Sequence, residues 1–310
     1  METYHIAMAT DCPLDQDFFK ILEIAAHKNG LTTYRVQPYN LKETIRQLRS
    51  GQIRFLSYYD RASDTSSEFY EIQSELSNNQ IIHFIDLDRQ NAASDKSLMH
   101  ERFVLSNVNV PKTIILPEYD TQPSIDLEHV DPEILGCPFV IKPSLNTGAG
   151  DGVHTDVTIL EDVKKKRIDF PQDKYLLQEK IIPKEENLRR YWFRIFYVCG
   201  RIIYTWWNDH THRYQTFSED DQNLVNQAEI NTIMNRIYEI CGLNFFSTEL
   251  AITEEHKIVA VDYVNEICDM RLQSKYFDGV PDEIVRLIAE EIVTYLQVLL
   301  RKVNPIDCIV

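Results

Sequence analysis

Short apolar runs alternate with helical patterns of apolar residues over the first hundred residues of the chain. The apolar runs predict strands at 5–9, 32–36, 53–58 and 81–86, and the segments between them predict helices at 15–28, 41–48 and 66–76. Strands separated by helices and short loops form parallel sheets with helices on both faces. We therefore expect a doubly wound α/β unit. No GxGxxG follows its first strand, which argues against a dinucleotide site.

The pattern changes near residue 110, where the apolar runs become typical of antiparallel strands. We expect strands at 113–116, 139–142, 175–180, 193–199 and 201–206, the last two joined by a turn at Gly200. A second hairpin, at 247–252 and 258–264, lies between predicted helices at 230–241 and 282–302. The fold class is thus α/β followed by α+β.

The composition of the chain excludes some classes of function and partner. The chain has 32 Lys and Arg against 48 Asp and Glu, a net charge of −16, which argues against nucleic acid or an anionic membrane as the main partner. No apolar run is long enough to span a membrane and the first residues lack a signal-peptide pattern, so we expect a cytoplasmic protein. The six cysteines contain no CxxC pair, and we expect buried, reduced thiols.

The first candidate for chemistry is a glycine cluster. Only nine of 310 residues are glycine, yet three fall within 148–152, after a predicted strand that ends in a lysine. Glycines let a backbone wrap phosphate oxygens, and hydroxyl and ammonium groups add donors. Because the lysine precedes the loop, a P-loop is excluded. An ordinary hairpin with a solvent-directed lysine is the alternative. The residues concerned are Lys142, Ser144, Thr147, Gly148, Gly150 and Gly152.

Two further segments are candidates for nucleotide contacts. Asp95 is suited to cap a helix whose first turn carries Lys96, although capping without chemistry is the alternative. The strand end at 178–182 combines aliphatic residues with backbone groups that an adenine ring needs, although a plain surface strand fits as well.

A hard-oxygen site is expected near the C-terminal hairpin. Adjacent strands can bring Glu249 beside Asp262, and Asn265 adds a neutral oxygen. Carboxylates crowded on an apolar hairpin repel one another, and Mg²⁺ would resolve that repulsion. A solvated strand edge is the alternative.

In this order and spacing, the segments resemble the ATP-grasp superfamily, in particular glutathione-synthetase-like enzymes and ribosomal-protein glutamate ligases. The resemblance covers roughly residues 85–270 and rests on "NVPKT" (109–113), "FVIKPSLNTGAGDGV" (139–153), "LLQEK" (176–180), "WFRIFYVCGRII" (192–203) and "VAVDYVNE" (259–266). It implies an N-terminal α/β domain at 1–108, a small ATP-grasp lobe at 109–183 and a large lobe with antiparallel sheet at 184–310.

The resemblance also assigns roles. Lys96 and Lys142 would hold ATP phosphates, 148–152 would form a mobile loop over them, and Arg194 would lie near the transferred phosphate. The metal, Mg²⁺ with Mn²⁺ as an alternative, would be bound by Glu249, Asp262 and Asn265. The adenine hinge would comprise Gln178, Glu179, Lys180, Ile181 and Ile182.

One departure from the family pattern concerns the metal site. The usual motif is acidic-x-Asn, whereas here two residues separate Asp262 from Asn265. Either a β-bulge realigns Asn265 or Glu266 takes its place.

The implied activity is that of a carboxylate–amine ligase, in which ATP phosphorylates a carboxylic acid and an amine attacks the acyl phosphate. The substrates would be a small acid and an amine, such as an amino acid or peptide. Candidate substrate contacts are Trp206, Trp207 and Arg213, and Arg271 is a candidate carboxylate clamp unless it pairs with Asp269.

Two other function classes stay open. A kinase of similar fold would phosphorylate a hydroxyl, but a polyphosphate substrate would need a denser basic surface than this acidic chain offers. A non-catalytic nucleotide-binding module is the other class, and the retained lysines and carboxylates argue against it. Such enzymes are commonly homodimers, and the sequence contains no decisive interface.

Overall fold

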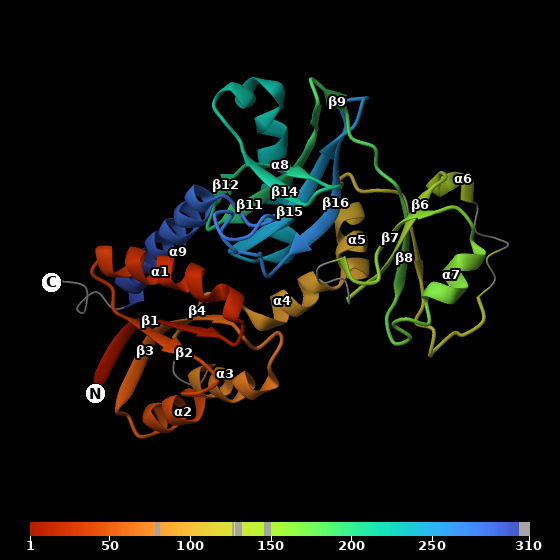
Figure 1. The fold of residues 1–310 in the computed structure, drawn as a ribbon. Coiled ribbons are helices and arrows are strands. Elements are labelled where there is room, and N and C mark those ends of the chain that lie inside the picture. Colours follow the sequence, from red (N-terminus) through yellow and green to blue (C-terminus); the bar gives the residue numbers. More distant parts are fainter. Residues whose placement is uncertain (78–80, 126, 128–131, 146–149, 304–310) are drawn as a thin grey trace.

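A computed structural model describes residues 1–77, 81–125, 127, 132–145 and 150–303 (Figure 1). Its N-terminal unit is built on a parallel sheet in the order β2-β1-β3-β4, which confirms the predicted α/β unit. The elements of this unit are β1 (Glu2–Thr10), β2 (Thr33–Val36), β3 (Ile53–Arg61), β4 (Ile82–His83), α1 (Gln16–Lys28), α2 (Leu41–Arg49), α3 (Tyr70–Ser77) and the short 3-10 turns Pro13–Asp15 and Ser67–Phe69.

Successive side chains of a strand point to opposite faces of the sheet, and both faces of this sheet are covered. Ile6 and Met8 of β1 pack in one core with α1 and the C-terminal helix α9 (Asp282–Val303), which lies alongside α1 in Figure 1. Ala7 and Ala9 pack in a second core with α2 and α3. Helix α9 therefore joins the N-terminal sheet to the rest of the molecule.

The strand predicted at 81–86 is shorter in the structure because a helix begins there. The side chain of Asp86 accepts a hydrogen bond from the backbone N–H of Arg89 and caps α4 (Leu87–Ser94). Asp95 caps α5 (Lys96–Leu105) through the N–H groups of Ser97 and Leu98, as predicted. Both helices precede the predicted domain boundary at residue 108, yet they contact α8 and β16 of the C-terminal part.

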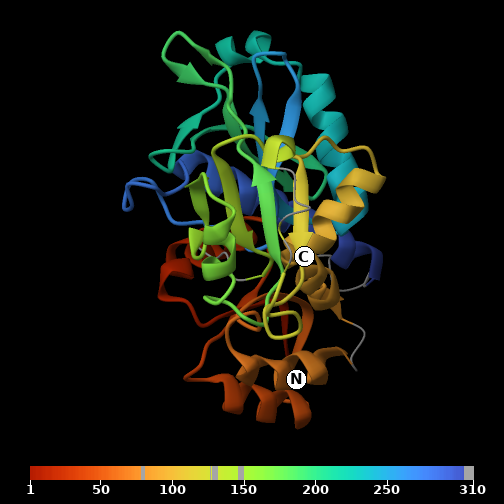
Figure 2. The same cartoon turned by 90° about the vertical axis from the view of Figure 1, so that its right-hand side faces the viewer.

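The second sheet forms what we call the small lobe, with antiparallel strands in the order β5-β8-β6-β7. It faces the viewer in Figure 2. Its core contains Phe139, Ile141 and Leu177. The elements of the small lobe are β5 (Thr113–Leu116), α6 (Pro132–Leu135), β6 (Phe139–Pro143), β7 (His154–Val157), α7 (Glu161–Lys166) and β8 (Tyr175–Glu179).

The third sheet forms the large lobe, with antiparallel strands in the order β14-β13-β11-β15-β16 and β12 paired to β11. The strand predicted at 201–206 is interrupted at Tyr204, although both parts pair with β11. The elements are the hairpin β9 (Glu185–Glu186) and β10 (Arg189–Arg190), β11 (Trp192–Val198), β12 (Arg201–Ile203), β13 (Thr205–Asn208), β14 (Arg213–Thr216), a 3-10 turn at Asp220–Leu224, α8 (Gln227–Cys241), β15 (Phe245–Ile252) and β16 (Ile258–Asn265).

The two faces of this sheet have different neighbours. Phe193 and Ile195 of β11 pack in one core with α8, whereas Trp192 and Phe196 belong to the core that contains α1 and α9. In the described part of the chain, no helix has the length and apolar character needed to span a bilayer.

Candidate active site

Three charged residues form a row across the large sheet. Arg194 on β11 lies opposite Glu249 on β15, which lies opposite Asp262 on β16. Residues directly opposite one another on neighbouring strands share a face of the sheet. Arg194 forms an ion pair with Glu249, whose Oε2 also accepts a hydrogen bond from Trp192 Nε1 at 3.0 Å. The antiparallel register thus brings together residues that lie far apart in the sequence.

A β-bulge brings Asn265 to the same face. Ser247 pairs with Asn265 and Glu249 pairs with Asp262, so two steps along β15 correspond to three steps along β16. Since Ser247 and Glu249 point to one face, the extra residue on β16 puts Asn265 on that face beside Asp262. The register therefore contains the β-bulge that was one of the two alternatives for the unusual spacing, while metal binding by Asn265 or by Glu266 stays a prediction.

The two candidate lysines approach this row from different elements. Lys96 is the first residue of α5, and its Nζ lies 3.1 Å from Asp262 Oδ1. Lys142, near the end of β6, has its Nζ 3.4 Å from the carbonyl oxygen of Val261. Helix α5 lies between β16 and the small lobe in Figure 1. The two ammonium groups contact neighbouring residues, Asp262 and Val261, in the middle of β16.

The hydrogen bonds that join α5 to β6, which we call the Ser144–Asp95 tie, were not predicted. Ser144 Oγ donates to Asp95 Oδ1 at 2.6 Å and accepts from the backbone N–H of Ser97 at 2.8 Å. The backbone N–H of Lys96 donates to the carbonyl oxygen of Ser144 at 3.1 Å. Ser144, predicted to contact phosphate, instead uses its hydroxyl to join the cap of α5 to the end of β6, and so fixes both lysines relative to one another.

The charges at the site shift one another's proton affinity. Burial lowers the pKa of Lys142 to about 8, and the positive charge of Lys96 adds to the effect although Asp262 opposes it. Burial alone would raise the pKa of Asp262, but Lys96, Lys142 and Arg194 outweigh it and hold that pKa at about 2. Burial also acts to lower the pKa of Lys96, yet Asp262 and Glu266 reverse it and the net shift is upward. Positive charge from Lys96, Lys142 and Arg194 is therefore concentrated around the carboxylate of Asp262.

A buried polar network lies behind Lys142. Tyr263 accepts a hydrogen bond from Gln178 Nε2 at 2.6 Å and is 2.7 Å from His100 Nδ1 through the same hydroxyl. Gln178 Nε2 also donates to Thr113 Oγ1 at 2.9 Å, and the Lys142 ammonium lies 5.3 Å from the centre of the Tyr263 ring. This network joins β5, β8, α5 and β16. No local pattern in the sequence indicated this network, because its members lie far apart along the chain.

The remaining residues predicted for the adenine hinge lie at the end of β8. Lys180 forms an ion pair with Asp156 at 2.6 Å, and Glu179 Oε2 accepts from the backbone N–H of Lys112 at 3.3 Å. Ile181 is partly buried against the large core, whereas Ile182 is exposed. The amide nitrogen of Gln178 donates to Thr113 and to Tyr263 inside the protein, so that nitrogen is not available to an adenine ring.

The glycine cluster is described only in part. Thr147 and Gly148 lie outside the described residues. Gly150 and Gly152 have φ of 82° and 67°, a region that side-chain-bearing residues rarely adopt. A Cβ on Gly152 would lie 2.7 Å from Phe170 Cε2. Glycine is thus required at 152 for packing as well as for conformation, whatever the loop binds.

The paired tryptophans point to opposite faces of the sheet. Trp207 lies beside the charged row, with the guanidinium carbon of Arg194 4.4 Å from its ring centre. Trp206 packs on Phe193 in the core with α8, and its Nε1 donates to Asp221 at 3.1 Å. Of the two predicted pocket residues, only Trp207 is brought to the site, because alternate residues of a strand face opposite sides.

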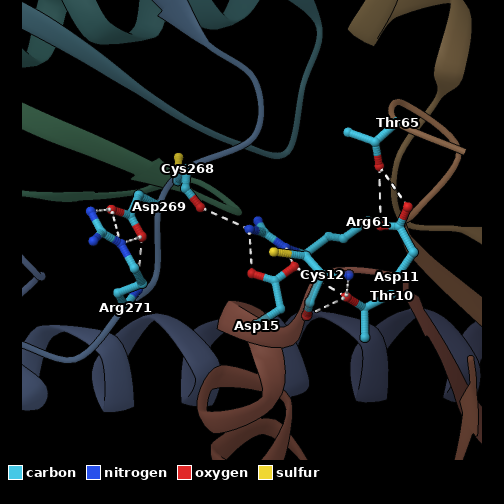
Figure 3. Close-up of polar contacts among 9 residues, drawn as sticks. All are labelled: Thr10, Asp11, Cys12, Asp15, Arg61, Thr65, Cys268, Asp269 and Arg271. Carbon is cyan, nitrogen blue, oxygen red and sulfur yellow. Dashed lines mark hydrogen bonds and ion pairs between the residues drawn. The ribbon is translucent and has the colours of Figure 1, made fainter. Parts of the chain in front are cut away.

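The arginine predicted to clamp a substrate carboxylate is already paired. Arg271 Nη2 lies 2.6 Å from Asp269 Oδ2 and 2.8 Å from Asp278 Oδ2, and Figure 3 draws the Asp269 contact. These hydrogen bonds, first that of Asp269, raise the pKa of Arg271 above its usual value. The structure therefore favours the salt-bridge alternative. Arg213 stacks on Phe277, with 4.3 Å between the guanidinium carbon and the ring centre.

The oxygen donors on β15 and β16 have the chemistry that a hard cation prefers. Two carboxylates and an amide, from Glu249, Asp262 and Asn265, share one face, and the carboxylates are each neutralised by a basic side chain. Within the described ranges, no three His, Cys, Asp or Glu side chains cluster closely enough to hold a metal on their own. Any metal here therefore needs the amide or the nucleotide phosphates as further ligands.

Comparison with known proteins identifies the fold. No family model matches the chain, and no curated protein sequence matches it. Among solved structures, a RimK domain ATP-grasp protein from Sphaerobacter thermophilus is 18% identical with a TM-score of 0.63, over 94% of this chain and 98% of that one. D-alanine–D-alanine ligase from Bacillus anthracis, complexed with ATP, is 13% identical with a TM-score of 0.65, over 97% and 99%.

A third match has a peptide in its structure. The ATP-grasp ligase PsnB, complexed with a variant of its minimal precursor, Mg and ADP, is 12% identical with a TM-score of 0.62, over 96% of this chain and 98% of that one. These likenesses extend over nearly the whole length of each chain. The protein therefore has the ATP-grasp fold, as the sequence motifs indicated.

Proposed function

We propose that this protein is an ATP-dependent ligase that joins a carboxylic acid to an amine through an acyl phosphate. The observation that carries the proposal is the convergence of Lys96, Lys142 and the Arg194–Glu249–Asp262 row around the middle of β16, on an ATP-grasp fold. The solved structures of similar fold include ligases with ATP or with Mg and ADP, which supports ATP and Mg²⁺ here.

The proposed reaction has two steps. An oxygen of the substrate carboxylate attacks the γ-phosphorus of ATP, the bond to the bridging oxygen breaks, and ADP leaves. The amine nitrogen then attacks the acyl carbon, inorganic phosphate leaves with the bonding electron pair, and the nitrogen loses its proton. Both steps concentrate negative charge on phosphate oxygens, so the rate depends mainly on positioning and on fixed positive charge.

The chain supplies that charge from three side chains. We assign Lys96 and Lys142 to the ATP phosphates and Arg194 to the transferred phosphate, because the first two reach β16 from the small-lobe side and the third lies in the sheet. Glu249, Asp262 and Asn265 would hold Mg²⁺, which when bound neutralises phosphate charge. Arg194 pairs with Glu249, and Lys96 pairs with Asp262, whose carboxylate the neighbouring cations keep ionised.

For the substrates, we assign one contact residue and a chemical class only. Trp207 is the predicted wall residue that lies against Arg194, so we assign it to the space next to the transferred phosphate. The acid and the amine would be small molecules or peptide groups, and the PsnB structure with its precursor supports a peptide among the candidates.

An ADP-release screen tests this function. The purified protein is incubated with ATP and MgCl₂ and with amino acids, small acids and peptides, singly and in pairs. We expect ADP and phosphate only when an acid and an amine are both present, with a condensed product of matching mass. Phosphate transferred stably to an alcohol would identify a kinase instead. ATP bound without turnover under every pairing would identify a nucleotide-binding module.

A further inference from the structure

A buried arginine of the N-terminal sheet, paired with Asp15, also donates a hydrogen bond to the segment that follows β16 (Figure 3). Arg61, the last residue of β3, binds Asp15 through two hydrogen bonds, Nε to Oδ2 at 2.9 Å and Nη2 to Oδ1 at 2.8 Å. The same Nη2 donates to the carbonyl oxygen of Cys268 at 3.0 Å. Arg61 and Cys268 are separated by 207 positions, so this contact crosses from the N-terminal unit to the large lobe.

The side chain of Arg61 is buried and packs against an aromatic ring. This side chain is 6% exposed, and its guanidinium carbon lies 5.6 Å from the ring centre of Phe18. A guanidinium has a planar fork of donors that can bind both carboxylate oxygens and still donate to a third acceptor, which a lysine ammonium does less well. The geometry therefore depends on arginine at this position and on Asp15 to orient it.

The acceptor lies three residues beyond a predicted metal ligand. The thiol of Cys268 lies 3.5 Å from the carbonyl oxygen of Asn265 and can donate to it, which closes the turn between them. On the far side, the backbone N–H of Arg271 donates to Asp269 Oδ1 at 3.0 Å. Hydrogen bonds within the segment 265–271 thus join residues near each of its ends. The hydrogen bond from Arg61 fixes the carbonyl group of Cys268 between them.

We propose that Arg61 is a positioning residue for the metal-binding end of β16. By holding the Cys268 carbonyl it fixes the turn that carries Asn265, and so couples the N-terminal unit to the oxygen donors of Glu249 and Asp262. Partners that hydrogen-bond directly to a metal ligand commonly change metal affinity by about 10–100-fold when they are removed, and Arg61, which acts through the Cys268 carbonyl, should fall at the low end of that range. The proposal rests on the proposed function only through the metal site.

The chain offers a matched control. Arg35 on β2 makes a similar forked ion pair, with Glu23 of α1 at 2.6 and 2.7 Å, and its guanidinium carbon lies 6.0 Å from the ring centre of Phe19. Its third hydrogen bond goes to Gln16 at 2.8 Å, so within the described residues these contacts remain in the N-terminal unit. Removing Arg35 therefore removes a comparable ion pair without touching the large lobe.

The experiment compares Arg61→Met with Arg35→Met by hydrogen exchange, without nucleotide and with MgCl₂ as the only added ligand. We expect amide exchange in 262–271 to rise about tenfold in Arg61→Met and to stay unchanged in Arg35→Met. The MgCl₂ concentration that gives half of the protection of 262–271 should rise about tenfold in Arg61→Met only. Arg61→Lys should recover part of both effects.

Unpaired Asp15 could prevent Arg61→Met from folding, and the double variant Arg61→Met with Asp15→Leu then replaces it. Equal exchange in the Arg61 and Arg35 variants would overturn the proposal. A rise in exchange without a change in the MgCl₂ midpoint would also overturn it, as would a wild-type protein whose 262–271 segment does not respond to MgCl₂. Failure to release ADP in the wild-type protein contradicts only the proposed reaction, because neither exchange measurement uses turnover.

Discussion

The phosphate side and the substrate side of the candidate site differ in how their residues are held. On the phosphate side, Arg194, Glu249 and Asp262 pair across three neighbouring strands, and Lys96 completes the set from α5. On the substrate side, Arg271 is bound by two aspartates of its own segment. The pairing of β-strands determines which of their residues lie opposite one another. It does not determine the partners of residues in connecting segments, which pair with neighbouring residues. The strand register thus brings the side chains of the motif-bearing side together, while their roles stay predictions.

The largest effect is expected from Lys142→Ala. The ammonium of Lys142 is buried beside β16 and has no carboxylate partner at hydrogen-bond distance among the described contacts, so its charge is available to phosphate. We expect ATP turnover to fall about 1000-fold or more, with an unchanged circular dichroism spectrum. Lys164→Ala, which removes a lysine paired with Glu161 on the exposed side of α7, is the control. Turnover near the wild-type rate would remove Lys142 from the site.

Arg194→Ala should separate chemistry from binding. Arg194 lies in the sheet, paired with Glu249, and we assign it to the transferred phosphate. We expect kcat to fall about 100-fold while the Kd of ATP, measured by calorimetry, changes by less than about threefold. Arg194→Lys should retain part of the rate. Equal losses of kcat and of ATP affinity would indicate a plain binding role.

Asp262→Asn tests the metal assignment. The substitution keeps the size of the side chain and removes a charge that three cations stabilise. We expect the MgCl₂ concentration for half-maximal ADP release to rise about tenfold. Glu266→Gln is the comparison, since Glu266 was the alternative to Asn265. A shift with Glu266→Gln and none with Asp262→Asn would reverse the assignment.

The lowered pKa of Lys142 predicts a pH profile. With a pKa of about 8, Lys142 loses its proton in the free enzyme as pH rises through that value, so kcat/KM for ATP should fall above about pH 8. Bound phosphate stabilises the charged form, and kcat should therefore stay level to higher pH. Lys142→Arg, which stays protonated, should lose the fall even if its activity is lower throughout. A wild-type kcat/KM that is level to pH 10 would contradict the shift.

The smallest effect is expected on the substrate side. Arg271→Ala breaks the contacts with Asp269 and Asp278, which are local to the segment after β16. We expect kcat and the KM of the acid to change by less than about threefold, and the melting temperature to fall by a few degrees. A large rise in the KM of the acid would restore Arg271 as a carboxylate clamp and would weaken the contrast between the two sides.

Several particular elements were predictable because their signals are local. The strand predicted from the apolar run at 5–9, the Asp95 cap and the glycine turn at 200 each depend on neighbours within a few residues, and each is present in the structure. The strand predicted at 81–86 ended early, because Asp86 forms a helix cap in place of a strand residue. For the tryptophan pair, the sequence could say that one of the two faces the core, but not which one.

The amino-acid sequence by itself determined the order of strands and helices, the ATP-grasp motifs and the residue types available for phosphate and metal. Tertiary structure alone decided which of them meet. The Ser144–Asp95 tie, the Tyr263 network and the contact from Arg61 to Cys268 join residues 49 to 207 positions apart. The physical reason is that periodicity and caps act over a few residues, whereas such contacts exist only after three sheets have packed and buried their polar groups.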